Sequence, residues 1–379
     1  MDLYIDRDAL GRGLARIQGI VERRSTHPLL GHVLLNARAP EGDAPGALRT
    51  TATDAEVAYI GDVEATVEQP GALAVEAASL FQIVRALPEP TVRLTAVKGN
   101  RLEIRSGRAS FKLPGFPADD YPALPAFDAR SAAVLSERDL GRLVDRTHFS
   151  VAQDDLRYGL NGVHLEEVQA EQGPRLRFVA TDGHRLSAAE APFEGDLVIT
   201  PRTLVPRKAL AVIRKLLEGG DGAVEVSFGE GAIHLATRDG AERFWFRLLD
   251  GEFPEYQAVV PKESRYRVAI RRSELASALR RVLILVQDRT RAVRFAFNAD
   301  DLRIDLQNAD RGEVVEEVPV ELEGEPVEVG FNPRYLQDVL SVLDGDRVIL
   351  ELAHPLAACL LRDPDDESAF FVVMPMRLD

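Results

Sequence analysis

The stretch ERDLGRLVDRTH (residues 137–148) has the pattern of an amphipathic helix, and that pattern occurs three times in the chain. Leu140, Leu143 and Val144 point toward a core, whereas arginines recur every four residues on another face. Comparable helices are predicted from Arg7 to Arg24 and from Arg272 to Gln287, so that successive starts lie 130 and 135 residues apart. This spacing predicts one supersecondary unit used three times.

Each unit contains a second predicted helix and several predicted strands. The second helices are expected at Ala77 to Leu87, Pro206 to Glu218 and Asn332 to Leu343. Alternating polar and apolar residues between the helices predict strands joined by hairpins such as Lys98-Gly99-Asn100. Two helices on one face of antiparallel sheet define an α+β fold class. The Pro-rich passages after residues 115 and 251 suggest domains at residues 1–127, 128–260 and 261–379.

The last unit ends in a strongly apolar segment, Phe370-Phe-Val-Val-Met-Pro-Met-Arg-Leu378. In the first two units the corresponding passage leads into another domain, but no fourth unit follows here. We expect a free apolar tail that acts as a binding surface and not as the end of a core strand. Its two methionines flank Pro375, and methionine side chains adapt to different ligands.

Composition limits the class of protein. The chain has 379 residues, of which 45% are hydrophobic and 28% charged, as in soluble globular proteins. It shows neither a membrane span nor a leader pattern, so a cytoplasmic location is expected. Cys359 is the only cysteine, which excludes an intrachain disulfide.

The net charge of −15 argues against a protein that binds nucleic acid over its whole surface. The arginines are nevertheless clustered on the first helix of each unit. Solvated helix faces are one interpretation of this clustering. Because the arginines lie at equivalent positions in three units, a second interpretation is favoured, in which all three helices face a common partner. The arginines concerned are Arg12, Arg16, Arg138, Arg142, Arg146, Arg280 and Arg281.

No motif nominates a catalytic centre, a metal site or a cofactor site, so the chain is not expected to be an enzyme. The densest polar cluster is ATDGHRL (residues 180–186), between two predicted strands. A local hairpin turn is one interpretation. A catalytic Asp182 and His184 pair is a second, although no nucleophile accompanies it. A binding edge is the third.

The segment ATDGHRL together with VVMPMRL (residues 372–378) resembles the bacterial DNA polymerase III β subunit family, the β sliding clamps. The resemblance covers the whole chain and includes Phe149-Ser150, Leu160-Asn161-Gly162 and Gly330-Phe331-Asn332. It implies three clamp-type domains per chain and a head-to-tail homodimer that forms a six-domain ring. Helices would line the hole, sheets would form the wall, and the ring would slide on duplex DNA while it tethers polymerases.

The resemblance also implies site residues. A pocket for partner peptides would comprise Leu160, Thr181, Gly183, His184, Arg185, Leu186, Pro254, Val259, Val372, Val373, Met374, Pro375, Met376, Arg377 and Leu378. DNA-facing residues would also include Arg24, Arg157, Tyr158, Arg207 and Lys208. The subunit interface would pair Phe111 and Leu113 with Ile284 and Leu285, for which core packing is the alternative. The sequence departs from the family at Gly159, Ala258 and Asp379.

The expected partners are a second copy of the chain, double-stranded DNA bound without sequence readout, the replicative polymerase, the clamp loader, and other polymerases and repair proteins. No membrane and no cofactor are expected. Two alternatives from other classes remain at this point. An enzyme acting on a small molecule would need a concave site with perturbed acids and bases. A scaffold without a nucleic-acid role would share the repeats, and its basic helix faces would be incidental.

Overall fold

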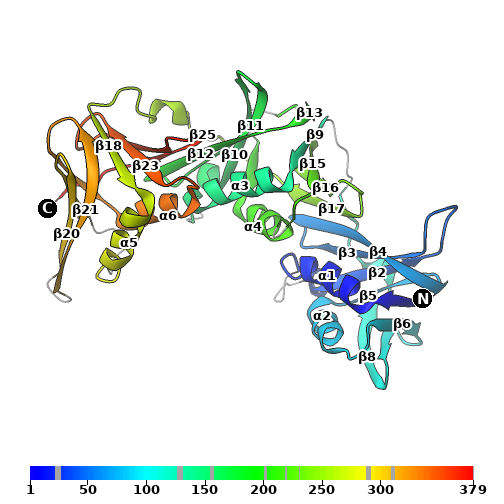
Figure 1. The fold of residues 1–379 in the computed structure, drawn as a ribbon. Helices are drawn as coiled ribbons and strands as arrows, with labels where there is room; N and C mark the ends of the chain where they lie inside the picture. The colour runs from blue at the N-terminus through cyan, green and yellow to red at the C-terminus, as the bar shows by residue number, and fades with distance from the viewer. Residues whose placement is uncertain are drawn as a thin grey trace. The chain divides into compact units, whose positions relative to one another are not determined.

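The computed structural model describes residues 1–21, 27–125, 131–153, 158–199, 203–217, 220–229, 231–286, 292–308 and 312–378, with the backbone alone at 158 and 308 (Figure 1). These residues fall into two compact units. The first unit contains Met1–Arg138, Phe193–Val198 and Lys208–Leu248. The second contains Asp139–Pro192, Ile199–Arg207 and Leu249–Asp379. The middle repeat therefore contributes to both units.

The first unit is built on one 13-stranded sheet with the strand order β1-β6-β7-β8-β5-β2-β3-β4-β17-β16-β15-β9-β13. Strand β4 also pairs with β1, which closes the strands of the first repeat into a circuit. The elements are β1 (Asp2–Asp6), α1 (Arg7–Ile17), η1 (Pro28–Gly31), β2 (His32–Arg38), β3 (Ala47–Thr53), β4 (Val57–Gln69), β5 (Gly71–Glu76), α2 (Ala77–Ala86), β6 (Thr91–Val97), β7 (Arg101–Ser106), β8 (Ala109–Phe116), η2 (Ala118–Asp120), β9 (Ser131–Ser136), β13 (Glu194–Asp196), α4 (Arg207–Leu216), β15 (Ala223–Gly229), β16 (Ala232–Thr237) and β17 (Glu242–Arg247).

The second unit is built on a 12-stranded sheet with the order β14-β10-β11-β12-β25-β24-β23-β18-β21-β20-β19-β22. Its elements are α3 (Glu137–Thr147), η3 (His148–Ser150), η4 (Tyr158–Leu160), β10 (Gly162–Ala170), β11 (Gly173–Thr181), β12 (Arg185–Pro192), β14 (Leu204–Pro206), η5 (Tyr256–Ala258), β18 (Tyr266–Arg271), α5 (Arg272–Val282), β19 (Val293–Phe297), β20 (Asp301–Asn308), β21 (Gly312–Glu323), β22 (Val327–Phe331), α6 (Pro333–Val342), β23 (Arg347–Leu352), β24 (Cys359–Asp363) and β25 (Asp366–Val373).

The three predicted repeats are confirmed, and so is the α+β class. In each repeat a short strand (β1, β9 or β18) leads directly into the first helix. Side-chain oxygens cap the N-termini of several helices. Asp6 accepts a hydrogen bond from the amide of Ala9 at 2.8 Å, and Asn332 accepts one from the amide of Arg334 at 3.0 Å. In the first unit α1 and α2 lie side by side, as α5 and α6 do in the second (Figure 1). No helix among the described residues is long and apolar enough to cross a membrane.

Consecutive repeats are joined by main-chain pairing as well as by linkers. Strand β4 of the first repeat pairs antiparallel with β17, the last strand of the second, from Val57↔Phe246 to Gly61↔Glu242. Strand β12 of the second repeat pairs in the same way with β25, the last strand of the third, from Arg185↔Val373 to Ala189↔Ala369. Each joint is therefore a continuous sheet.

The prediction that the segment from Phe370 is a free tail was wrong for its first half. Residues up to Val373 belong to β25, which pairs with β12 on one side and β24 on the other. Val372 is 1% exposed and Val373 is fully buried. A strand buried on both faces has a continuous apolar pattern, which cannot be told from an apolar tail by periodicity alone. Only the stretch from Met374 onward lies at the surface, where Met376 forms a bridge with Gly330.

Candidate binding sites

The ATDGHRL segment forms the tight turn between β11 and β12. Thr181 Oγ1 donates to the carbonyl of Arg185 at 2.7 Å, and the amide of Arg185 donates to Asp182 Oδ1 at 3.0 Å. Gly183 has φ 87°, a left-handed conformation that glycine adopts without steric cost. The predicted hairpin turn is therefore present, but its side chains do not bond only within the turn, because Arg185 also reaches Asp338.

Arg185 connects this turn to the third repeat. Its guanidinium donates to Asp182 Oδ2 at 3.0 Å, to Asp338 on α6 and to the carbonyl of Phe149. It also lies 4.6 Å from the ring centroid of Tyr335, which stacks against His184 at 6.5 Å. Arg185 is largely buried and fixes the turn in place. The sequence reading missed Tyr335 and Asp338, because nothing local marks helix residues that meet a turn about 150 positions earlier.

An apolar cluster lies beneath the same turn. Its buried members are Val179, Leu186, Ala188, Tyr256, Leu360 and Val372, and half-buried Phe253, Val260, Ala358 and Phe370 pack against them. Three large apolar side chains in nearby chain segments are exposed: Val259 is 48% exposed, Met374 38% and Leu378 41%. The backbone of Met374 is held beside the turn, because its amide donates to the carbonyl of His184 at 2.9 Å.

These contacts define how the predicted pocket residues are distributed. Thr181, Gly183, His184 and Arg185 form the turn, Met374 begins the surface stretch beside it, and Pro375, Met376, Arg377 and Leu378 continue along β22. Leu186, Val372 and Val373 are buried core residues, so the prediction that they line the surface of the pocket was wrong. Leu186 and Val372 belong instead to the apolar cluster. Leu160 is half-buried, whereas Pro254 and Val259 are exposed.

The structure explains why a glycine occupies position 159. A Cβ atom there would lie 2.4 Å from the carbonyl oxygen of Glu252, so a side chain would push the η4 turn away from the segment before Phe253 and Pro254. Ala258 is exposed in η5, and Asp379 lies outside the described residues.

The predicted DNA-facing residues divide into several groups. Arg12, Arg138, Arg207 and Arg280 are exposed. Three further basic residues are accessible to solvent but form ion pairs within the chain. Arg142 pairs with Asp344, Lys208 with Asp54 and Arg281 with Glu316. Arg16 is 30% exposed, 3.6 Å from Glu242. Arg24 and Arg157 lie outside the described residues, and of Tyr158 only the backbone is described.

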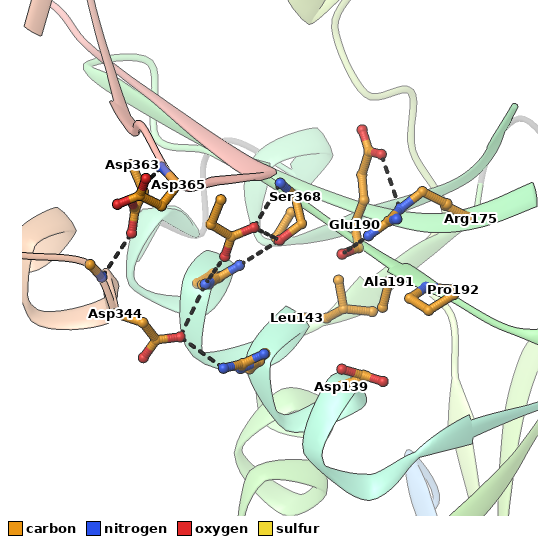
Figure 2. Close-up of a pocket in the computed structure, with 15 residues that line it drawn as sticks. Asp139, Leu143, Arg175, Glu190, Ala191, Pro192, Asp344, Asp363, Asp365 and Ser368 are labelled. Atoms are coloured by element: carbon orange, nitrogen blue, oxygen red, sulfur yellow. Dashed lines mark hydrogen bonds and ion pairs between the residues drawn. The ribbon is translucent and has the colours of Figure 1, made fainter. Parts of the chain in front are cut away.

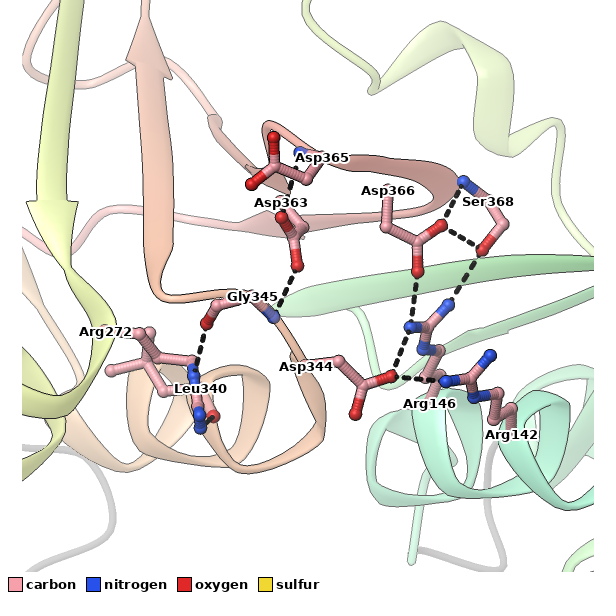
Figure 3. A network of polar contacts seen from close by, with 10 residues as sticks. All are labelled: Arg142, Arg146, Arg272, Leu340, Asp344, Gly345, Asp363, Asp365, Asp366 and Ser368. Carbon is pink, nitrogen blue, oxygen red and sulfur yellow. Dashed lines mark hydrogen bonds and ion pairs between the residues drawn. The ribbon is translucent and has the colours of Figure 1, made fainter. Parts of the chain in front are cut away.

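Arg146 is not DNA-facing. Its side chain is 4% exposed and donates to Ser368 Oγ at 2.8 Å, to Asp366 at 2.6 Å and to Asp344 at 3.3 Å (Figure 3). It belongs to a polar cavity whose walls also include Asp139, Arg175 and Glu190 (Figure 2). Burial alone would raise the pKa of Asp366, but the hydrogen bonds from Ser368 and Arg146 outweigh it and lower that pKa to about 2. The prediction failed because periodicity cannot tell a solvated arginine from one that a neighbouring domain covers.

The four predicted interface residues lie at the surface or close to it. Phe111 on β8 is 40% exposed and Ile284, just after α5, is 69% exposed. Core packing within one chain is thereby excluded for these two. Leu113 and Leu285 are half-buried. Large exposed apolar side chains commonly mark association surfaces.

A half-buried histidine near the apolar cluster predicts a pH dependence. The ring of His164 stacks on Phe253 at 5.1 Å, and burial lowers its pKa despite the opposing charge of Glu166. In the unfolded chain its pKa is about 6.5. Below that pH the unfolded state takes up the proton more readily, so the free energy of unfolding should fall as pH falls from about 6.5 toward the folded-state pKa. In denaturant unfolding at several pH values, His164→Gln should flatten this slope, while the same change at exposed His354 should not. Equal slopes in all three proteins would contradict the assignment.

Comparison with known proteins shows which class of protein this chain is similar to. Over its full length, and over 100% of each structure, it matches a crystal structure of the Caulobacter crescentus beta sliding clamp with a TM-score of 0.91 and 35% identity. It matches the Pseudomonas aeruginosa clamp bound to griselimycin with a TM-score of 0.88 and 35% identity, again over all of both chains. The repeats and their joints thus define the architecture of a DNA sliding clamp.

Sequence comparison agrees with the structural one. Three family models of the DNA polymerase III beta subunit match this chain. The model of the N-terminal domain matches residues 1–125, that of the central domain 134–255 and that of the C-terminal domain 257–377. The beta sliding clamp of Escherichia coli is 34% identical over 379 residues, which cover 100% of both chains. The chain belongs to the DNA polymerase III beta subunit family, and its function is that of a DNA sliding clamp.

Proposed function

We propose that two copies of this chain join head to tail into a closed ring of six domains around duplex DNA. The supporting observation is the repeated joint. Strand β4 of the first repeat pairs with β17, the last strand of the second repeat. Strand β12 of the second repeat pairs with β25, the last strand of the third. In the third repeat, β21 corresponds to β4 and β12. In the first repeat, β8 corresponds to β17 and β25. We propose that β21 of one subunit pairs with β8 of the other. A contact between two different surfaces closes into a ring when the rotation fits.

Exposed apolar residues support this joint. Phe111 lies on β8, and Ile284 follows the helix that packs against β21. Leu113 and Leu285 accompany them. The domain boundaries proposed for the ring are residues 1–127, 128–260 and 261–379, and they agree closely with the ranges of the three family models.

The inner surface is proposed to carry the exposed arginines Arg12, Arg138, Arg207 and Arg280, with Arg16, Arg142, Lys208 and Arg281 nearby. Few cationic contacts with phosphates give positioning without base readout. The net charge of −15 keeps DNA from the rest of the surface. Weak contacts permit sliding, and ring closure provides retention. No chemical step is part of this role, which we place in the cytoplasm.

The surface formed by the 181–185 turn, Val259 and the stretch from Met374 to Leu378 is proposed to bind short apolar peptides. These would come from the replicative polymerase, the clamp loader, other polymerases and repair proteins. The apolar cluster below supplies a rigid base, and two methionines supply adaptable side chains. A shared surface would let several proteins use the ring in turn.

The ring is tested by its retention on DNA. Loaded by its clamp loader and ATP onto a nicked circle, the protein should survive a salt wash that removes ordinary phosphate-binding proteins, whose affinity falls steeply with salt. Cutting the circle should then release it. Leu285→Asp is the matched control, because a folded monomer of that variant should be lost from both DNAs. Equal dissociation of the unmodified protein from circular and linear DNA would favour a scaffold without topological retention.

A further inference from the structure

The first helix of each repeat carries an arginine at its last position but one. These residues are Arg16 in α1, Arg146 in α3 and Arg281 in α5. Because the three helices have the same length and follow equivalent strands, the arginines occupy equivalent places. Their partners, however, are not equivalent.

Arg16 reaches from the first repeat to the second. Its guanidinium donates to the carbonyls of Lys215 and Leu216, at 3.0 and 2.9 Å, and so caps the C-terminal end of α4. Cations are favourable at that end of a helix. Its Nε also lies 3.6 Å from Glu242, the first residue of β17. The joint between these two repeats is thus fastened by a charged side chain as well as by the β4–β17 pairing.

Arg146 makes the corresponding connection from the second repeat to the third. It contacts Asp344, just beyond the C-terminal end of α6, and Asp366, the first residue of β25 (Figure 3). In both cases the arginine meets the end of the next repeat's second helix and an acid at the start of its last strand. We call this arrangement an arginine latch.

Arg281 lies in the third of the described repeats, and its acidic partner comes from that same repeat. Its guanidinium makes two bonds of 2.6 Å to Glu316, on β21 of its own repeat. In a second copy, the residue corresponding to Glu242 and Asp366 is the first residue of β8, which is Ala109. Alanine offers no carboxylate to an incoming arginine.

We infer that arginine latches fasten the two joints within a chain, and that the joint between chains lacks one because Arg281 is bound by its own strand. This inference rests on the proposed ring. The joint between subunits then lacks the charged contact that Arg16 and Arg146 give to the two joints inside each chain, so an acid placed there should slow subunit exchange.

The experiment measures subunit exchange between two fluorescently labelled populations of the full-length dimer. Arg281→Ala should change the exchange rate by less than about twofold, because its bond lies within one subunit. Combining Glu316→Ala with Ala109→Glu should create the missing latch and slow exchange by about tenfold or more, an effect that high salt should weaken. Glu316→Ala alone is the matched control and should not slow exchange.

Other results would overturn the inference. If Arg281→Ala accelerates exchange about tenfold while the circular dichroism spectrum is unchanged, Arg281 already reaches the second subunit. If the double variant and its counterpart with Ala109→Asp are both folded yet exchange at the original rate, the missing acid is not what distinguishes the joint. A monomeric unmodified protein in light scattering would instead contradict the proposed ring itself.

Discussion

Arg146→Ala is expected to lower the free energy of unfolding of the second unit by about 3–5 kcal/mol, the usual cost of removing one partner from a buried ion pair. The change would remove the Arg146 bonds to Ser368 Oγ and to Asp366 Oδ2, and Asp366 would keep only the bonds from Ser368. Asp344 would lose one of its two arginines. Chemical denaturation followed by fluorescence and circular dichroism measures the effect.

Arg142→Ala is the matched control for this prediction. Arg142 lies on the same helix and bonds the same Asp344 at 3.0 Å, but its side chain is 41% exposed. Exposed ion pairs contribute about 0–1 kcal/mol, so this variant should be close to the unmodified protein. Equal stability of the two variants would mean that Arg146 does not fasten the joint.

Removal of residues 374–379 is expected to weaken the binding of a polymerase-derived peptide by about 2 kcal/mol or more, the scale of an interface hot spot. The cut leaves β25 complete, because that strand ends at Val373. It removes Met374, whose amide bonds to the turn at His184, and Leu378, a second exposed apolar side chain. Titration calorimetry with the peptide gives the affinity, and light scattering checks that the dimer persists.

Gly330→Ala tests the same surface without shortening the chain. A Cβ atom at this position would lie 2.4 Å from the carbonyl oxygen of Met376, so the terminal stretch would have to move. The variant should lose peptide affinity in the same direction as the truncation. Unchanged affinity in both proteins would place the peptide site elsewhere.

Much of the fold was predictable because its signals are local and repeated. Helices with a polar and an apolar face have a clear period, and the three copies reinforced one another. The short strands before the first helices were missed, since five or six residues, as in β1 and β9, give little periodicity. The helices also proved to end earlier than predicted, as α1 does at Ile17.

The site was predictable only in part, because its residues come from distant segments. The turn at residues 181–185 and the stretch from Met374 were indicated by their resemblance to a family. Tyr335 and Asp338 were not, since their helix has an ordinary amphipathic pattern. Arg146 shows the opposite error: a regular basic face suggested solvent or DNA, but the third repeat covers its last arginine.

The main-chain pairing between repeats has a practical consequence for anyone who divides this chain. A fragment of residues 261–379 would keep β25 but lose β12, which pairs with it from Ala189↔Ala369 to Arg185↔Val373. The fragment would then present an unpaired strand edge that includes Phe370 and Phe371. Such apolar edges recruit other strands and promote aggregation. Insolubility of a single repeat would therefore reflect where the chain was cut and not an inability of its sequence to fold.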